Sequence, residues 1–98
     1  MNVSYAENAV DYEIPITTQD TQYALALPNG VKAIEIQCRD TTDIRCSFTA
    51  GKVAVPASPI QTIKGGGRYV KEHLYLNAHT LYVAAGTGSK VVEVRVWL

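Results

Sequence analysis

The stretch AIEIQCRDTTDIRCSF, residues 33–48, decides the fold. On both sides of its polar run, residues 39–43, apolar side chains fall at every second position: Ile34, Ile36, Cys38, Ile44, Cys46 and Phe48. A two-residue period is that of a β-strand with one buried face. The stretch therefore predicts a β-hairpin over residues 33–49. In its register Ile36 opposes Phe48, and Cys38 opposes Cys46.

The rest of the chain repeats these strand signals. Residues 80–85 and 90–97 alternate in the same way around GTGS, residues 86–89, and predict a second hairpin. Further short strands are expected at residues 12–17, 21–27, 53–55, 60–64 and 68–76. About eight strands at this spacing predict one antiparallel β-sandwich over residues 20–98, with a jelly-roll-like layout. The positions expected to point inward include Ile36, Phe48, Val83 and Val94.

The N-terminal segment differs from the rest. Residues 1–10 show no regular spacing of apolar side chains and contain few large apolar residues. Residues 1–19 are therefore expected to form an arm that is either extended along a neighbouring molecule or frayed. Residues 1–13 lack the basic and apolar regions of a secretory signal, which favours synthesis and folding in a cytoplasm.

Composition narrows the class of partner. In 98 residues, nine basic side chains balance nine acidic ones, and charged residues make up 18% of the chain. Nucleic-acid binding depends on Lys and Arg that neutralise phosphates, so no nucleic-acid partner is expected. No apolar run approaches the roughly 20 residues of a membrane-spanning helix, so no membrane partner is expected either. A low charge fraction suits a protein that lies against other protein surfaces.

Catalytic and metal-binding patterns are weak. Glu72, His73 and His79 are the best metal candidates, but a cupin-like site needs a His-x-His pair and a third histidine. Cys38 and Cys46 are expected to be buried thiols, since directly opposed positions of a regular hairpin rarely suit a disulfide. The glycine-rich segments at residues 65–67 and 86–88 are each followed by a predicted strand, whereas a phosphate-binding loop is followed by a helix. Both segments are therefore expected to be turns. We therefore expect no enzyme, no catalytic residue, no cofactor and no metal.

Aromatic residues supply the candidate interface. The chain has six tyrosines and one phenylalanine, and tyrosine is enriched where proteins meet. Tyr69 and Tyr75 fall on the strand face opposite Leu74 and Leu76. Either this face points outward and can contact a partner, or it is simply the second face of a strand at the edge of the sandwich. Trp97 lies opposite the valines of its strand, where it is expected to pack on a neighbour or a loop. The candidate interface residues are Tyr5, Tyr12, Tyr69, Tyr75 and Trp97.

The C-terminal part of the chain resembles small β-sandwich structural proteins of tailed bacteriophages, of the capsid decoration or cement type. The resemblance is carried by LYVAAGTGSKVVEV, residues 81–94, and extends as a pattern of strands and turns over residues 22–98. The chain departs from the pattern at residues 65–67, where three glycines replace the usual apolar-Pro-Gly turn.

The resemblance implies a non-enzymatic virion protein. Such a protein binds the major capsid protein on the capsid exterior, stabilises the contacts between capsid subunits, and resides in the host cytoplasm during assembly. It also implies a homo-oligomer, with a trimer as the expected form. Two alternatives remain at this point: a phage tail, neck or fibre-attachment module, and a carbohydrate-binding β-sandwich in which Tyr69, Tyr75 and Trp97 form a sugar-stacking face.

Overall fold

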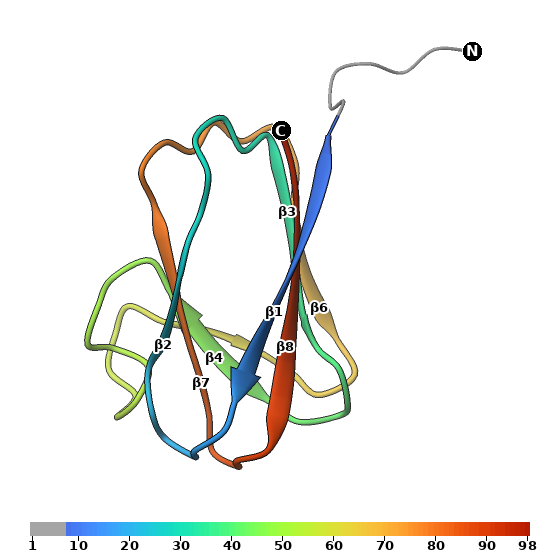
Figure 1. The fold of residues 1–98 in the computed structure, drawn as a ribbon. Coiled ribbons are helices and arrows are strands. Elements are labelled where there is room, and N and C mark those ends of the chain that lie inside the picture. Colours follow the sequence, from blue (N-terminus) through green and yellow to red (C-terminus); the bar gives the residue numbers. More distant parts are fainter. Residues whose placement is uncertain (1–7) are drawn as a thin grey trace.

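A computed structural model describes residues 8–98 as eight β-strands joined by turns (Figure 1). The strands are β1 (Ala9–Ile16), β2 (Tyr23–Ala26), β3 (Ala33–Cys38), β4 (Ile44–Ser47), β5 (Gln61–Ile63), β6 (Arg68–Lys71), β7 (Thr80–Ala85) and β8 (Lys90–Trp97). The strands alternate buried and exposed residues, as the two-residue period of the sequence predicts.

The strands form two four-stranded antiparallel sheets that face each other. Sheet A has the order β1-β8-β3-β6, and sheet B has the order β2-β7-β4-β5. The chain changes sheet at every connection except the one between β4 and β5. Two facing sheets with these crossings are a jelly roll. The prediction of an antiparallel β-sandwich of about eight strands is therefore confirmed.

Both predicted hairpins are wrong. β3 and β4 lie in different sheets, and so do β7 and β8. Ile36 is paired with Val94 and Tyr69 rather than with Phe48. Cys46 is paired with Val83 and Gln61 rather than with Cys38. The predicted register requires both strands to lie in one sheet, whereas β3 and β4 belong to opposite sheets and face each other across the core.

The crossing between β3 and β4 is held by a contact within it and by contacts with the start of β8. Asp40 Oδ1 accepts a hydrogen bond from the Thr42 amide at 2.9 Å, and Asp40 Oδ2 forms an ion pair with Lys90 Nζ at 2.9 Å. The Arg39 amide donates to the Val91 carbonyl at 2.9 Å. These contacts fasten the crossing to the start of β8. The Lys90 ammonium and the Thr42 donors hold the pKa of the Asp40 carboxyl well below its usual range.

Replacing Asp40 with asparagine is expected to destabilise the protein at neutral pH and to matter less in acid. A carboxyl whose folded-state pKa is lowered contributes its stability above the unfolded-state pKa, near 3.8. That contribution is lost as the pH falls from there toward the lower folded-state value. Melting temperatures of wild type and Asp40→Asn, measured from pH 7 down to pH 2, should converge. A gap that stays constant over this range would contradict the assignment.

β1 belongs to the sandwich. The expected arm over residues 1–19 is corrected from residue 9 onward, because Ala9–Ile16 pairs with β8 along its whole length. Ile14 and Ile16 are buried in the core. Asp11 and Glu13 alternate with these inward positions and are exposed, so the strand reads as polar although its inward-facing residues are apolar. Residues 1–7, and with them Tyr5, lie outside the described residues.

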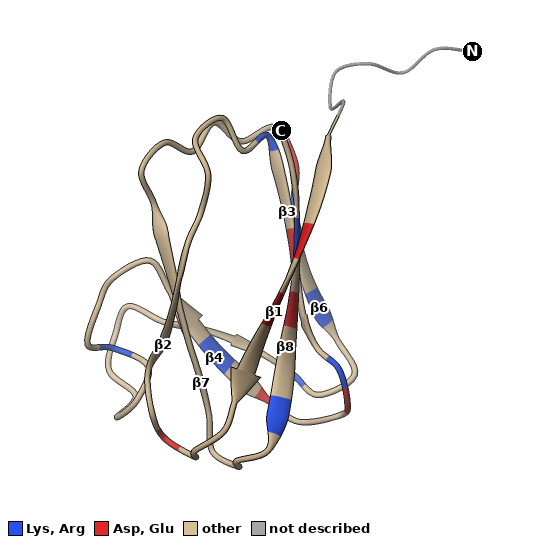
Figure 2. Ribbon diagram, in the orientation of Figure 1, with Lys and Arg blue, Asp and Glu red and all other residues tan. Residues whose placement is uncertain are grey.

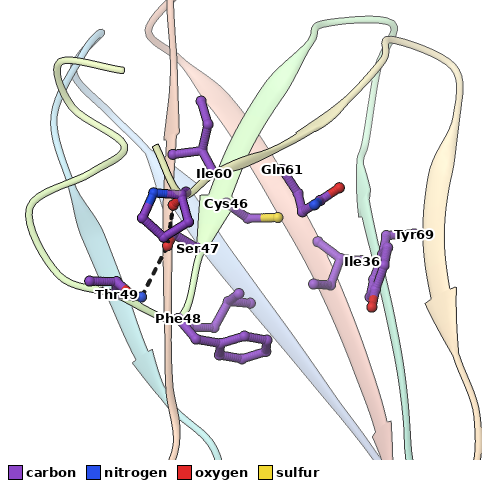
Figure 3. A pocket seen from close by; sticks show the side chains of 10 residues that line it. Ile36, Cys46, Ser47, Phe48, Thr49, Ile60, Gln61 and Tyr69 are labelled. Carbon is purple, nitrogen blue, oxygen red and sulfur yellow. Dashed lines mark hydrogen bonds between the residues drawn. The ribbon is translucent and has the colours of Figure 1, made fainter. Parts of the chain in front are cut away.

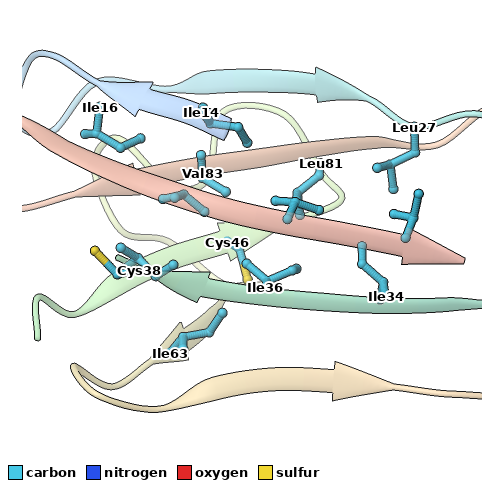
Figure 4. Packing of buried hydrophobic residues seen from close by; sticks show 14 of the residues in the cluster. Ile14, Ile16, Leu27, Ile34, Ile36, Cys38, Cys46, Ile63, Leu81 and Val83 are labelled. Carbon is cyan, nitrogen blue, oxygen red and sulfur yellow. The ribbon is translucent and has the colours of Figure 1, made fainter. Parts of the chain in front are cut away.

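The core lies between the sheets and is built almost entirely of aliphatic side chains (Figure 4). Its fully buried members come from both sheets and include Ile34, Ile36, Ile44, Leu81 and Val83. Phe48, expected in the core, is 46% exposed, because β4 ends at Ser47 and no strand covers the side chain beyond it.

The strand expected over residues 68–76 ends at Lys71. His73 has a φ of +58°, a conformation that interrupts a strand and resets the alternation of its side chains. Tyr69 before the break and Leu74 after it therefore both pack against the core. In an uninterrupted strand an odd-numbered and an even-numbered residue would point to opposite faces.

A long loop, residues 48–60, lies against the outer side of sheet B. Its Val53 is fully buried outside the main core, in a turn and not in the strand expected at residues 53–55. Arg45 of β4 holds the loop: its Nε donates to the Val53 carbonyl at 2.7 Å and its Nη2 to the Ala54 carbonyl at 3.2 Å. The same guanidinium pairs with Asp20 at 2.8 Å. Arg45 thereby joins β4, this loop and the turn that precedes β2.

Candidate functional site

Charged residues are concentrated on the strands of sheet A (Figure 2), and those on its outer side pair with one another. Arg95 binds Asp11 at 2.6 Å, and Arg68 binds Glu35 at 3.0 Å. Arg39 binds two carboxylates, Glu13 of β1 at 2.7 Å and Glu93 of β8 at 3.0 Å. The hydrogen bond from Arg95 lowers the pKa of Asp11, and that from Arg39 lowers the pKa of Glu93. This side is a hydrated surface whose charges are already matched.

Sheet B differs sharply in charge. Within residues 8–98, the four strands of sheet B contain one charged residue, Arg45, and its guanidinium is engaged under the loop 48–60. Beyond that loop the outer side of β2 and β7 presents a surface that we call the neutral face, made of Ala24, Ala26, Thr80 and Tyr82. Ala24 is paired with Tyr82 and Ala26 with Thr80, so the four side chains form one continuous surface.

The neutral face was missed at the level of sequence. The signal was available, because residues 23–26 and 80–85 contain no charged residue. Their importance depends on β2 and β7 being neighbours in one sheet, which the predicted hairpins concealed. Depletion of charge is the compositional mark of the centre of protein interfaces.

A second candidate surface surrounds Trp97 at one end of sheet A. Its side chain borders a surface hollow of about 600 Å³, lined by Lys32, Ala33, Val70, Glu72, His73, Leu74 and Trp97. Two backbone hydrogen bonds fix this hollow: the Lys32 amide donates to the Trp97 carbonyl at 2.7 Å, and the Leu74 amide donates to the Lys32 carbonyl at 2.9 Å. We call it the Trp97 hollow.

The structure separates the aromatic residues singled out in the sequence. Tyr12 and Tyr69 pack against the core. Tyr75 is 75% exposed, and Trp97 lines its hollow on the outer side of sheet A. Tyr69, Tyr75 and Trp97 therefore do not form one sugar-stacking face, because Tyr69 points between the sheets while Trp97 points away from them.

The candidate metal ligands are also not assembled. Glu72 and His73 line the Trp97 hollow, whereas His79 packs edge-on against Phe48, with ring centres 5.8 Å apart. His79 Nδ1 lies 2.8 Å from the Asn77 carbonyl oxygen. Among residues 8–98, no three His, Cys, Asp or Glu side chains gather closely enough to hold a metal ion.

Both cysteines are free and buried, each in a different sheet. Burial raises the pKa of the Cys46 thiol to about 11, and it also raises the pKa of Cys38. A thiol with a raised pKa is mostly protonated near neutral pH and is a weak nucleophile. Two buried thiols serve here as small apolar residues.

Comparisons with known proteins inform on the fold. No family model and no curated protein sequence matches the chain. Within residues 8–98 no helix is long and apolar enough to span a membrane. A de novo designed double-stranded β-helix, solved in solution by NMR, is similar to this structure with a TM-score of 0.53 and 11% sequence identity. The similarity covers 93% of this chain and 99% of the designed chain. At this identity it supports the all-β fold of two antiparallel sheets and nothing further.

Proposed function

We propose that this protein is a non-enzymatic virion component of a tailed bacteriophage, a decoration or cement protein that binds the capsid exterior through the neutral face. The observation that carries the proposal is the division of charge between the two sheets. Sheet A keeps a hydrated, internally paired outer surface, whereas the exposed part of sheet B offers small, uncharged side chains and one tyrosine.

The neutral face suits contact with another protein for two physical reasons. Its small side chains at Ala24 and Ala26 allow close approach, and no charge has to be removed from water when it is covered. Tyr82 adds an apolar ring with a polar tip, which is typical of binding hot spots. The resemblance of residues 81–94 to decoration proteins agrees with this location, since Tyr82 belongs to that stretch.

A lysine placed on the neutral face tests the proposal. Ala24→Lys should weaken binding to capsids by at least about tenfold, because the ammonium would be buried without a partner. The matched control is Ala9→Lys, an exposed position of β1 in sheet A. Co-sedimentation with capsids of the encoding phage that lack this protein is the measurement. Equal binding by wild type and Ala24→Lys would contradict the assignment of the face.

Two further readouts belong to the same experiment. Light scattering on the free protein should give the mass of a trimer, whose several capsid contacts raise its effective concentration at the surface. Sedimentation with isolated tails, and not with capsids, would move the protein to a tail or neck position.

A further inference from the structure

A pocket opens between the two sheets on the side of the edge strands β5 and β6 (Figure 3). Its deepest lining residues are Ile36 of β3 and Leu81 of β7, both 1% exposed, together with Cys46 of β4. Phe48, Ile60 and Tyr69 stand around it nearer the surface. The pocket uses inward-facing residues of both sheets and is separate from the neutral face.

The lining of this pocket is neutral and mostly apolar. None of its ten lining residues carries a charge, and the Cys46 thiol stays protonated because burial raises its pKa to about 11. The Ser47 hydroxyl is already engaged, since it donates to the Pro59 carbonyl at 2.9 Å and accepts from the Thr49 amide at 3.0 Å. A charged group placed at the floor of the pocket, against Ile36 and Leu81, would lose its water without gaining a partner, which favours a neutral ligand.

Three polar side chains of the lining remain available at the pocket: the Thr49 hydroxyl at its exposed rim, the Gln61 amide and the Tyr69 hydroxyl. Of these, Gln61 and Tyr69 stand closest to the buried Ile36 and Cys46, because Gln61 is paired with Cys46 and Tyr69 with Ile36. Figure 3 shows the Cys46 sulfur, Ile36 and the rings of Phe48 and Tyr69 around the same space. An apolar cavity with a few unengaged polar groups is the usual form of a small-molecule site.

The size of the pocket sets the size of its ligand. Its volume is about 270 Å³. An engineered apolar cavity of about 150 Å³ binds benzene, so this pocket has room for one ring and a short substituent. We propose that the pocket binds a small neutral molecule with an apolar body of about one aromatic ring and a single hydrogen-bonding group, held by Gln61 or Tyr69.

The test is a pair of ligands that differ in charge. The full isotope-labelled chain is titrated with benzyl alcohol and, separately, with benzylammonium, and the backbone amide signals are followed by NMR. Benzyl alcohol should give saturable shifts at residues 46–49, 60–61 and 81, and benzylammonium should give none. Equal response to both ligands, no saturation, or shifts centred on Trp97 would overturn the proposal.

Variants locate the binding. Phe48→Ala should weaken benzyl alcohol binding by about tenfold, because the ring supplies one wall of the pocket. Val55→Ala, at an apolar side chain that is 80% exposed and outside the pocket, should leave binding unchanged. Phe48 is itself half exposed, so its removal is expected to leave the fold intact, and circular dichroism checks this. An unchanged affinity in folded Phe48→Ala would also overturn the proposal.

The amide of Gln61 has its own readout. Gln61→Leu should bring the affinity for benzyl alcohol down to that for toluene while leaving toluene binding in place. If Gln61→Leu keeps the full preference for benzyl alcohol, the hydrogen bond belongs to Tyr69, and Tyr69→Phe should then remove it. If neither variant changes the preference, the polar part of the proposal is wrong.

Discussion

Replacing Gly65 with alanine is expected to lower the free energy of unfolding by about 3 kcal/mol or more. Gly65 begins the turn through which the chain leaves β5 of sheet B for β6 of sheet A. A Cβ at this position would overlap the backbone carbonyl of Thr41, which belongs to the crossing between β3 and β4. Backbone atoms cannot rotate away as a side chain can, so one of the two loops would have to move.

The movement would also break a specific contact. The Gly65 amide donates to Asp43 Oδ1 at 2.6 Å, and this bond lowers the pKa of the Asp43 carboxyl. Close approach of two backbones is one of the few roles that only glycine can fill.

The neighbouring glycine provides the control. Gly66 has a φ of +82°, and a Cβ added to it would meet no atom within 4 Å, so Gly66→Ala should cost only the left-handed strain of about 1–2 kcal/mol. Urea unfolding of the two variants gives both free energies. Gly65→Ala should be the more destabilising, although Gly66 is the one with the positive φ. A smaller loss for Gly65→Ala than for Gly66→Ala would show that the loops are not in contact.

Replacing Ile16 with alanine is expected to lower the free energy of unfolding by about 2–5 kcal/mol. Ile16 is fully buried in the core at the end of β1, where it is paired with Lys90 of β8. Truncation removes apolar contacts and leaves a cavity, and both effects are unfavourable. A segment that lay outside the sandwich as an arm would tolerate the same change with almost no loss.

Glu13→Gln serves as the control within the same strand. Its side chain is mostly exposed and pairs with Arg39, and such an exposed ion pair contributes little to stability because solvent screens it. Chemical denaturation followed by tryptophan fluorescence at Trp97 can compare the two variants. Similar, small losses for both would mean that β1 does not carry the core contacts described above.

The candidate sites could be predicted only in part. The alternation of β8 placed Trp97 away from the core, and the structure puts it at the Trp97 hollow on the outer side of sheet A. The alternation expected over residues 68–76 gave the wrong face for Tyr69. The strand stops at Lys71, and the positive φ of His73 changes the direction of the side chains that follow. The neutral face and the pocket between the sheets combine residues distant in the sequence, and only the pairing of strands brings them together.

The sequence by itself determined the all-β class, the approximate positions of the strands and most of the side chains that point inward. A two-residue period carries this information, because burial of one face of each strand requires it. The sequence could not determine which strands pair. Both sheets turn an apolar face toward one core, so the alternation in residues 33–48 is equally compatible with a hairpin and with two strands that face each other. The tertiary structure decided between them: contacts such as Asp40 with Lys90 and Gly65 with Asp43 anchor the crossings, and β3 and β4 come to lie in opposite sheets.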